Sequence, residues 1–220
     1  MSLDFDSARL PNPHMREEHH EWRSQLRRFI DTEIMPHADD WDEAGHIPIE
    51  LWPKAAAVGL LGMGYPEEFG GVTEGIDCWH RWIASEELAR IGAGGIAASL
   101  MVHSIGLPPV INWGSQALKE MVAPPVLAGR KHISLGITEP GAGSDVAGLR
   151  STARRDGDAW VIDGSKLFIT NGVHADLYFV AARTGPGRHD ISMFIVDKDT
   201  PGFTVGRSLA KTGWLSSDTA

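Results

Sequence analysis

The sequence predicts an α+β protein in which an all-helical region, residues 1–131, precedes an antiparallel β-barrel or sandwich, residues 132–220. Two observations carry this prediction. Apolar residues recur at helical spacing in the first part and at every second position in the second. The composition, 42% hydrophobic and 22% charged over 220 residues, is that of a globular protein that buries a core. Fibrous, low-complexity and disordered classes are therefore excluded.

The helical prediction begins with a capped amphipathic helix. Asn12-Pro13 is typical of a helix start, because asparagine caps a helix and proline suits its first turn. Pro36 ends the pattern, and Pro48 opens a second helix that Gly59 closes. The apolar face of the first helix consists of Met15, Trp22, Leu26, Phe29, Ile30 and Ile34.

Three further helices are predicted before residue 131. The small apolar residues 92–101 suit a buried helix. Ser115 caps a last helix that runs to about Ala128, with Gly129 at its stop. The remaining helix carries an apolar stripe of Ile76, Trp79, His80, Ile83, Leu88 and Ile91.

After Lys131 the pattern becomes that of strands. Apolar residues alternate with small or polar ones in Ile133-Ser-Leu-Gly-Ile137. Three Asx-Gly pairs suit the positive φ angles of tight hairpin turns: Asp156-Gly157, Asp163-Gly164 and Asn171-Gly172. Strands are expected between and after them at residues 159–162, 166–170, 177–182, 191–196 and 203–206.

Charge and cysteine content exclude several function classes. The formal net charge is −9 and no basic stripe is present, which argues against nucleic acid and against an anionic membrane surface as partners. No window approaches the ~20 apolar residues that a membrane-spanning helix needs. Residues 1–6 lack the basic start and apolar core of a signal peptide. Cys78 is the single cysteine and cannot form an intrachain disulfide, so we expect a cytoplasmic protein.

A glycine-rich stretch, residues 137–145, leaves the first predicted strand. Gly141 and Gly143 permit close backbone approach, and successive backbone N–H groups there suit an anion such as a pyrophosphate. Ser144 adds a hydroxyl donor. The stretch is neither a Walker loop, since no Gly-Lys-Ser/Thr follows, nor a dinucleotide fingerprint, since GxGxxG is absent. On the glycines alone, a plain exit from a strand into a turn explains the pattern as well or better.

A second stretch, residues 166–172, is predicted to be a strand that delivers Phe168 and Thr170 two residues apart. That spacing puts both side chains on one face of a sheet. A flat heteroaromatic ring could lie against that face and accept a hydrogen bond from Thr170. Taken alone, this stretch is explained better by a core phenylalanine and a strand threonine before an Asn-Gly hairpin.

Other polar clusters point to no chemistry. His19 and His20 are neighbours on a helix and point about 100° apart, so we expect a solvated face there rather than a metal site. The other histidines show no metal-binding spacing, and no metal is expected. Glu86-Glu87 is interpreted as a surface and capping feature. No Gly-x-Ser-x-Gly elbow is present, which argues against a serine hydrolase.

Taken together, two stretches strongly resemble the acyl-CoA dehydrogenase family: Thr138-Glu-Pro-Gly-Ala-Gly-Ser-Asp145, followed by Phe168-Ile-Thr-Asn-Gly172. The resemblance covers the chain from about Pro13 to Ala220. Other pieces fit the family's pattern in the same order: Gly59-Leu-Leu-Gly, Pro66-Glu-Glu-Phe-Gly-Gly71, Glu86-Glu-Leu-Ala, Gly114-Ser, Asp163-Gly-Ser-Lys, Ala175-Asp, Thr200-Pro-Gly-Phe203 and Lys211-Thr-Gly…Ser217-Asp-Thr219.

The resemblance implies a helical N-terminal domain (residues 1–131), a flavin-facing middle β domain (residues 132–220) and a C-terminal helical bundle outside this sequence. It implies an FAD cofactor and a homo-oligomer, either a dimer or a tetramer. Many members have an aromatic residue where this chain has Leu135, and tryptophan where it has Phe168. The residues implied to contact FAD are Leu135, Gly136, Ile137, Thr138, Gly143, Ser144, Phe168, Ile169 and Thr170.

The resemblance also implies a role for each group. Thr138 would donate to the pyrimidine edge of the flavin, where donors stabilise the charge of the reduced ring. Gly143 and Ser144 would lie at the pyrophosphate, with Ser144 also near the acyl-CoA thioester arm. Phe168, Ile169 and Thr170 would flank the ring, and Thr170 would lie near the hydride-accepting nitrogen.

The implied reaction belongs to fatty-acid β-oxidation: an acyl-CoA thioester is oxidised to the trans-2-enoyl-CoA, and electrons pass to an electron-transferring flavoprotein. The family's base is a glutamate of the C-terminal bundle, so we expect it beyond residue 220 and expect this chain alone to be inactive. Glu139 is expected to be structural. Two alternatives stay open: a flavin monooxygenase or oxidase on the same scaffold, and a non-catalytic module.

Overall fold

A computed structural model of the chain describes residues 10–220. Residues 1–6, on which the expectation of no signal peptide rests, lie outside the described residues. Contacts group the chain into two compact units. The helical unit contains Met1–Met101, Val110–Arg130 and Lys211–Ser217, and the β unit contains Val102–Pro109, Lys131–Ala210 and Asp218–Ala220. A domain boundary at residue 131 stays a prediction.

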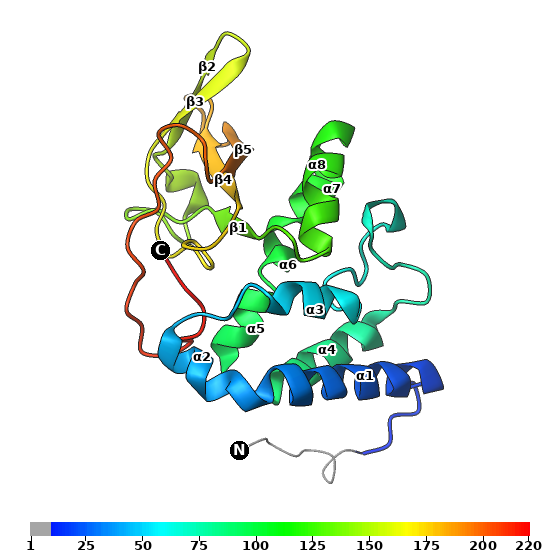
Figure 1. Cartoon of the computed structure of the whole chain (residues 1–220). Helices are drawn as coiled ribbons and strands as arrows, with labels where there is room; N and C mark the ends of the chain where they lie inside the picture. Colours follow the sequence, from blue (N-terminus) through cyan, green and yellow to red (C-terminus); the bar gives the residue numbers. More distant parts are fainter. Residues whose placement is uncertain (1–9) are drawn as a thin grey trace. The chain divides into compact units, whose positions relative to one another are not determined.

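The helical unit has its core where the predicted apolar faces meet. Helix α1 runs beside α4 (Figure 1), and Leu26 and Ile30 of α1 are fully buried together with Ile83 of α4. Each buried side chain of this size contributes roughly 1.5–3 kcal/mol. The elements are α1 (Glu17–Glu33), η2 (Met35–His37), α2 (Ala38–Ala44), α3 (Leu51–Ala57), η3 (Glu67–Phe69), α4 (Cys78–Ala89), α5 (Gly94–Leu100) and α8 (Gln116–Leu127).

The helix ends follow local chemistry. Ser115 caps α8 as predicted, because its hydroxyl accepts the backbone N–H of Leu118 at 3.3 Å. Helix α8 ends before Gly129, which has φ +67°. A Cβ added to Gly129 would lie 2.4 Å from the carbonyl carbon of Trp52. Helix α1 begins later than predicted, because Asn12 accepts the N–H of Met15 in a separate turn.

The β unit is built around the central strand β4. Its strands are β1 (Ile133–Gly136), β2 (Thr152–Asp156), β3 (Ala159–Asp163), β4 (Leu177–Arg183) and β5 (Ile191–Asp197). The strand order is β1-β4-β2-β3, and β5 also pairs with β4. Figure 1 shows the β2–β3 hairpin projecting from the rest of this sheet. Short helices α6 (His103–Gly106) and η4 (Val146–Gly148) belong to the same unit, and α7 (Pro108–Trp113) has residues in both.

The predicted fold class, a helical region followed by a β region, is confirmed. The sheet is mixed rather than antiparallel throughout, because β1 pairs with β4 in parallel. Residues 137–176 separate these two strands, which is longer than the dozen or so residues that a parallel crossover needs. The pairs β2–β3 and β4–β5 are antiparallel, as expected.

The strand predicted at residues 166–170 is wrong. Phe168 has φ +60° and Asn171 has φ +54°, so the chain turns out of the extended conformation twice in four residues. Asn171-Gly172 therefore opens an irregular turn rather than a hairpin. The predicted strand at 203–206 is also absent, whereas β2 was not predicted. The hairpin at Asp156-Gly157 is present, with Gly157 at φ +61° in its two-residue turn.

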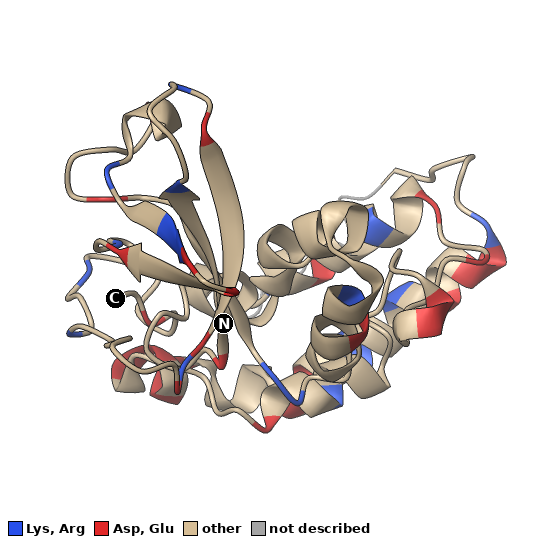
Figure 2. Ribbon diagram, turned by 90° about the horizontal axis from the view of Figure 1, so that it is seen from above, with Lys and Arg blue, Asp and Glu red and all other residues tan. Residues whose placement is uncertain are grey.

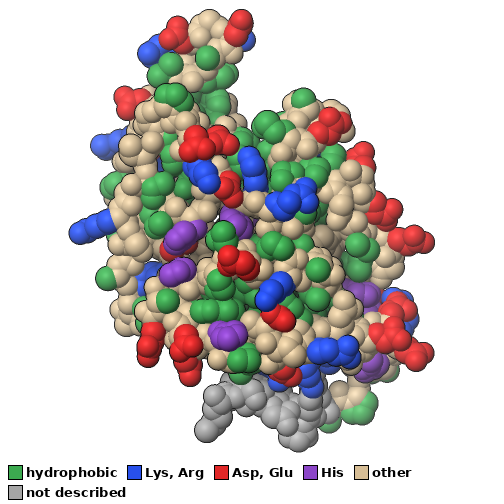
Figure 3. Space-filling model, viewed as in Figure 1, with side chains coloured by type: hydrophobic (Ala, Val, Ile, Leu, Met, Phe, Trp, Pro, Cys, Tyr) green, Lys and Arg blue, Asp and Glu red, His purple; other side chains and the backbone are tan. Residues whose placement is uncertain are grey.

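Figure 2 shows basic and acidic residues interspersed along the ribbon, and Figure 3 shows basic and acidic side chains interspersed on one face of the molecule. Among the described residues, no single helix is long and apolar enough to cross a membrane. The segments Gly94–Leu100 and His103–Trp113 meet that requirement only as a bent pair, on length and composition alone.

Candidate functional site

The two stretches singled out in the sequence lie side by side in the β unit. Leu167 donates its backbone N–H to the carbonyl oxygen of Thr138 at 2.8 Å. The Ser134 hydroxyl donates to the carbonyl oxygen of Thr170 at 2.9 Å. Residues 134–138 and 166–170 therefore run antiparallel to each other. The fold brings together the two sets of residues that the resemblance assigns to FAD.

Residues 135–138 of the first stretch are only partly covered by the rest of the chain. Leu135, Ile137 and Thr138 are half-buried, whereas Gly136 is buried. A Cβ added to Gly136 would lie 3.4 Å from Val180 Cγ2 and 3.7 Å from the Cγ atom of Lys166. These are ordinary van der Waals distances, so packing against Lys166 and Val180 does not by itself require glycine at position 136.

The glycine-rich loop leaves its backbone bare. Gly141, Gly143 and Ser144 are exposed, and a Cβ added to either glycine would meet nothing within 4 Å. Neither glycine has a positive φ. Crowding and backbone strain, the two usual reasons for glycine, are thus absent at both positions. The bare backbone fits an anionic group that approaches from outside, as a pyrophosphate would.

Phe168 adopts a conformation that bulky residues rarely show. Its φ is +60° and the residue is 63% exposed. The reason lies in its neighbours: Leu167 bonds to Thr138, whereas Ile169 exchanges two backbone hydrogen bonds with Ala220 at 2.8 and 3.1 Å. The chain crosses from one partner to the other at Phe168. Strained, exposed aromatic residues of this kind cluster at ligand sites.

The remaining residues of the second stretch differ in exposure. Ile169 is buried, and its backbone bonds to Ala220 and Gly172, so the structure gives it a packing role beside the candidate site. Thr170 is half-buried and pairs with Thr219 in an isolated bridge. Across residues 10–220, the hydroxyls of Thr138, Ser144 and Thr170 make no hydrogen bond within the chain. All three are available to a ligand.

Glu139 has the structural role expected of it. Its carboxylate accepts hydrogen bonds from Lys166 Nζ at 2.7 Å and from the backbone N–H groups of Arg150 (2.6 Å) and Ser151 (3.0 Å). Burial alone would raise its pKa, but these hydrogen bonds outweigh burial and lower the pKa of Glu139 to about 2. The carboxylate therefore anchors the loop that follows η4 to the first stretch.

Two basic residues of the site region were not predicted. Lys166 reaches both Glu139 and the carbonyl oxygen of Ile137, the latter at 3.1 Å. Arg183 donates to the carbonyl oxygens of Ala147 (2.7 Å) and Gly187 (2.6 Å) and so ties down the segment that follows the glycine-rich loop. The sequence around a single lysine or arginine does not predict which group it will bond to, because most of these partners are distant along the chain.

A cluster of His19, Asp77 and His80 in the helical unit brings ligand-type atoms within 4.8 Å of one another. The expectation of a solvated His19 is wrong: the residue is fully buried, with Nε2 3.1 Å from Asp77 Oδ1. Its Nδ1 accepts the backbone N–H of Arg16 at 2.9 Å, so the ring proton lies on Nε2 and is donated to Asp77. A protonated nitrogen cannot ligate a metal, and the cluster is a hydrogen-bonded cap of α4.

The surface role expected for Glu86-Glu87 is wrong for the second residue. Glu87 is fully buried and bonds to Arg23 (2.9 Å), Arg27 (3.0 Å) and Arg90 (3.2 Å). Burial raises the pKa of Glu87, but the hydrogen bonds and charges of these arginines lower it below its ordinary value. This network joins α1 to α4 and lies outside the β unit.

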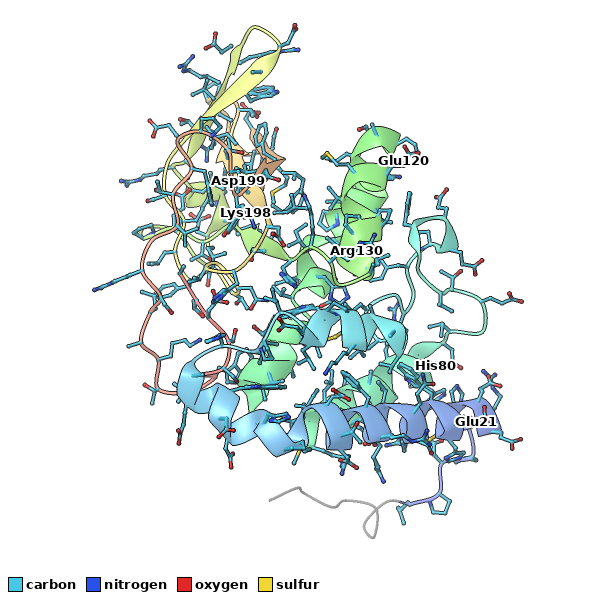
Figure 4. The ribbon with its side chains drawn as sticks, in the orientation of Figure 1. Glu21, His80, Glu120, Arg130, Lys198 and Asp199 are labelled. Carbon is cyan, nitrogen blue, oxygen red and sulfur yellow. The ribbon has the colours of Figure 1, made fainter. Side chains whose placement is uncertain are left out.

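The helical unit also contains a cavity of about 240 Å³. It is lined by α1, by residues of the segments between α3 and α4, and by His80 of α4; Figure 4 labels Glu21 and His80. All nine candidate flavin residues belong to the other unit, so this cavity is not the predicted site.

Comparison with known sequences agrees with the motifs. Residues 16–130 match "Acyl-CoA dehydrogenase, N-terminal domain", and residues 134–220 match "Acyl-CoA dehydrogenase, middle domain". The mitochondrial long-chain specific acyl-CoA dehydrogenase of Sus scrofa is 40% identical over 208 residues, covering 92% of this chain and 47% of its own length. An acyl-CoA dehydrogenase of Bacillus subtilis is 38% identical over 209 residues, covering 94% of this chain and 54% of its own. The chain spans about half the length of these relatives.

Solved structures share the fold. The acyl-CoA dehydrogenase of Geobacillus kaustophilus superposes with a TM-score of 0.88 at 37% identity, over 95% of this chain and 55% of that one. The acyl-CoA dehydrogenase of Bacillus anthracis, complexed with FAD, has a TM-score of 0.85 at 30% identity, over 96% of this chain and 36% of that one. A chain in the electron transferring flavoprotein structure of Acidaminococcus fermentans has a TM-score of 0.87 at 31% identity, over 95% of this chain and 55% of that one.

Proposed function

The chain belongs to the acyl-CoA dehydrogenase family, and from this premise we propose that its β unit holds FAD for the α,β-dehydrogenation of an acyl-CoA thioester. The product is the trans-2-enoyl-CoA. Because the chain spans about half the length of its relatives, the activity is proposed for a protein of the relatives' length. Within it, this chain contributes the flavin-facing part.

The observation that carries the proposal is the bare backbone at Gly141 and Gly143. Within residues 10–220 neither crowding nor a positive φ requires glycine at either position, and both face open space. The three hydroxyls of Thr138, Ser144 and Thr170, which make no hydrogen bond within residues 10–220, support the same site. A pyrophosphate at the loop and a ring beside Thr138 and Phe168 would satisfy all of these groups.

Each of these residues would have a distinct task. The backbone N–H groups around Gly143 and the Ser144 hydroxyl would hold the pyrophosphate, and Ser144 would also meet the thioester arm of the substrate. The Thr138 hydroxyl would donate to the pyrimidine edge, and Phe168 would shield the ring from water. Bound FAD supplies the ring that accepts the β hydride.

The base that removes the α proton is not Glu139. Its two oxygens accept hydrogen bonds from Lys166, Arg150 and Ser151, and its side chain is only 6% exposed. A base must reach the proton it removes, at about 2.6–3.2 Å between heavy atoms. We place the base in the part of the relatives that this chain does not span. We propose an electron-transferring flavoprotein as the electron acceptor. We also propose that the protein assembles as a homo-oligomer.

A spectroscopic titration tests the proposal. FAD added to the purified chain should show a perturbed flavin absorbance band. The titration should give a Kd in the micromolar range, which corresponds to a binding free energy of about −8 kcal/mol. The double variant Thr138→Val, Thr170→Val should weaken binding about tenfold, because each lost hydrogen bond costs roughly 0.5–1.5 kcal/mol. Thr204→Val, at an exposed position of the same unit, is the matched control and should bind FAD as the unaltered chain does. Equal binding by all three proteins would contradict the proposed site.

A further inference from the structure

We propose that Lys166, through its ion pair with Glu139, is a positioning residue that sets both the geometry and the local charge of the flavin-facing edge at Ile137 and Thr138. The inference rests on the proposed function, because it concerns how the chain presents that edge to FAD. It adds two residues to the site that the family motifs do not assign to the flavin.

The geometry of the pair is that of a clamp. Lys166 Nζ donates to Glu139 Oε1 at 2.7 Å and to the carbonyl oxygen of Ile137 at 3.1 Å. The next residue, Leu167, donates its backbone N–H to Thr138. Consecutive residues of the second stretch therefore hold three consecutive residues of the first. Thr138 lies between the two anchors, so the position of its backbone depends on both.

The far side of the clamp is equally constrained. Glu139 also accepts the backbone N–H groups of Arg150 and Ser151. Its own backbone exchanges hydrogen bonds with Ala142, at 2.8 and 3.2 Å, which closes the turn that carries Gly141 and Gly143. The pair thus connects the edge at Thr138 with the bare glycine loop.

The pair is also shielded enough to act electrostatically. The side chain of Lys166 is 12% exposed and that of Glu139 is 6% exposed. As a pair the two charges cancel, but removing one partner leaves an uncompensated charge directly behind Ile137. Charges in such partly buried positions are weakly screened, so this change would be felt by an anion at the edge.

The signs of the two single variants follow. Reduced FAD is an anion at mildly alkaline pH, and oxidised FAD has an uncharged ring. Glu139→Gln leaves the positive charge of Lys166, which favours the reduced form. Lys166→Met leaves the negative charge of Glu139, which disfavours it. A pair that only stabilises the fold would weaken both forms alike in both variants.

The experiment measures the Kd of oxidised FAD and of anaerobically reduced FAD for each protein. We expect the ratio of the oxidised to the reduced Kd to rise about fivefold in Glu139→Gln and to fall about fivefold in Lys166→Met. The double variant should return the ratio to that of the unaltered chain. Lys198→Met is the matched control: Lys198, labelled in Figure 4, also pairs with a carboxylate, Asp176 at 2.8 Å, and its ratio should not change.

A second readout follows the geometry without any flavin. Hydrogen exchange of the Leu167 amide should accelerate about tenfold in Lys166→Met relative to Lys198→Met. Glu139→Gln is isosteric and keeps an acceptor for Lys166, so it keeps the test valid if Lys166→Met fails to fold. FAD binding with unchanged ratios, or shifts of the same sign in both single variants, would overturn this inference alone. No FAD binding by the unaltered chain would overturn the proposed function and this inference with it.

Discussion

Leu167 and Thr138 are joined by a backbone hydrogen bond of 2.8 Å between segments that lie almost thirty residues apart. This bond places the second motif beside the first, with Lys166 behind the edge and Phe168 turned outward at φ +60°. The candidate site is therefore proposed on two segments of the β unit that are adjacent in space.

Because of Glu139, the unfolding free energy should depend on pH. Its pKa of about 2 in the folded protein lies below its ordinary 4.5, so its contribution is complete above pH 4.5 and is lost as pH falls toward 2. The unfolding free energy of the unaltered chain minus that of Glu139→Gln should be about 2 kcal/mol smaller at pH 3 than at pH 7. Urea denaturation at both pH values measures it. Asp145→Asn is the control, because Asp145 is exposed and pairs with Arg188. Its effect on the unfolding free energy should change by no more than about 0.5 kcal/mol between pH 3 and pH 7. A difference for Glu139→Gln that does not change with pH would contradict the ion pair.

Glu87 should be far more important for stability than its neighbour Glu86. Glu87→Gln leaves three arginines around a buried, neutral side chain and should cost about 3–5 kcal/mol. In Glu86→Gln the lost pair with Arg23 involves a carboxylate that is 31% exposed, and the cost should be about 1 kcal/mol or less. Urea denaturation of the two variants compares them directly. Similar losses for both would show that the buried network is misassigned.

Phe168 should be dispensable for the fold. Phe168→Gly relieves the left-handed conformation, so the unfolding free energy should stay the same or rise by up to about 1 kcal/mol, while FAD binding weakens. Phe203, which packs on Tyr178 at 4.5 Å between ring centres, is the control: Phe203→Gly should cost at least about 2 kcal/mol. Thermal unfolding and FAD titration of the two variants separate the roles. A large loss of stability in Phe168→Gly would contradict this prediction, because it would show that the Phe168 side chain stabilises the fold.

The loop glycines should tolerate a methyl group. Gly141→Ala and Gly143→Ala should change the unfolding free energy by less than about 0.5 kcal/mol, because each added Cβ meets open space. Gly71→Ala is the contrast, since its Cβ would lie 2.1 Å from the Tyr65 carbonyl oxygen. That variant should lose several kcal/mol or fail to fold. A strong loss in either loop variant would mean that the fold, not a ligand, requires glycine there.

Local patterns in the sequence predict much of the helical unit. The apolar spacing locates α4 to within a turn, whereas α1 begins later than Asn12-Pro13 predicts. Ser115 at the start of α8 and Gly129 after its end lie where they were predicted, because caps depend on neighbouring residues only. Glu87 could not be predicted in the same way. Its partners Arg23 and Arg27 are 60 or more residues away, and nothing local distinguishes a buried glutamate from an exposed one.

The β unit shows where local patterns are insufficient. The position of residues 166–170 between two Asx-Gly pairs favours a strand, yet pairing with Thr138 on one side and Ala220 on the other forces Phe168 into the left-handed region. Likewise, β1 pairs in parallel because of a long crossover that period-two spacing does not reveal. The flavin assignment itself came from family resemblance, and the nine residues stay a prediction.

The central claim, that the bare glycine loop receives the pyrophosphate of FAD, is tested most directly by a matched pair of valine variants. Gly143 and Gly206 both lie in the β unit, both face open space and neither has a positive φ, so valine should be tolerated at each. FAD titration should show unchanged binding in Gly206→Val and at least about tenfold weaker binding in Gly143→Val, because the side chain blocks the backbone N–H groups. Equal FAD affinity in the two variants would contradict the claim.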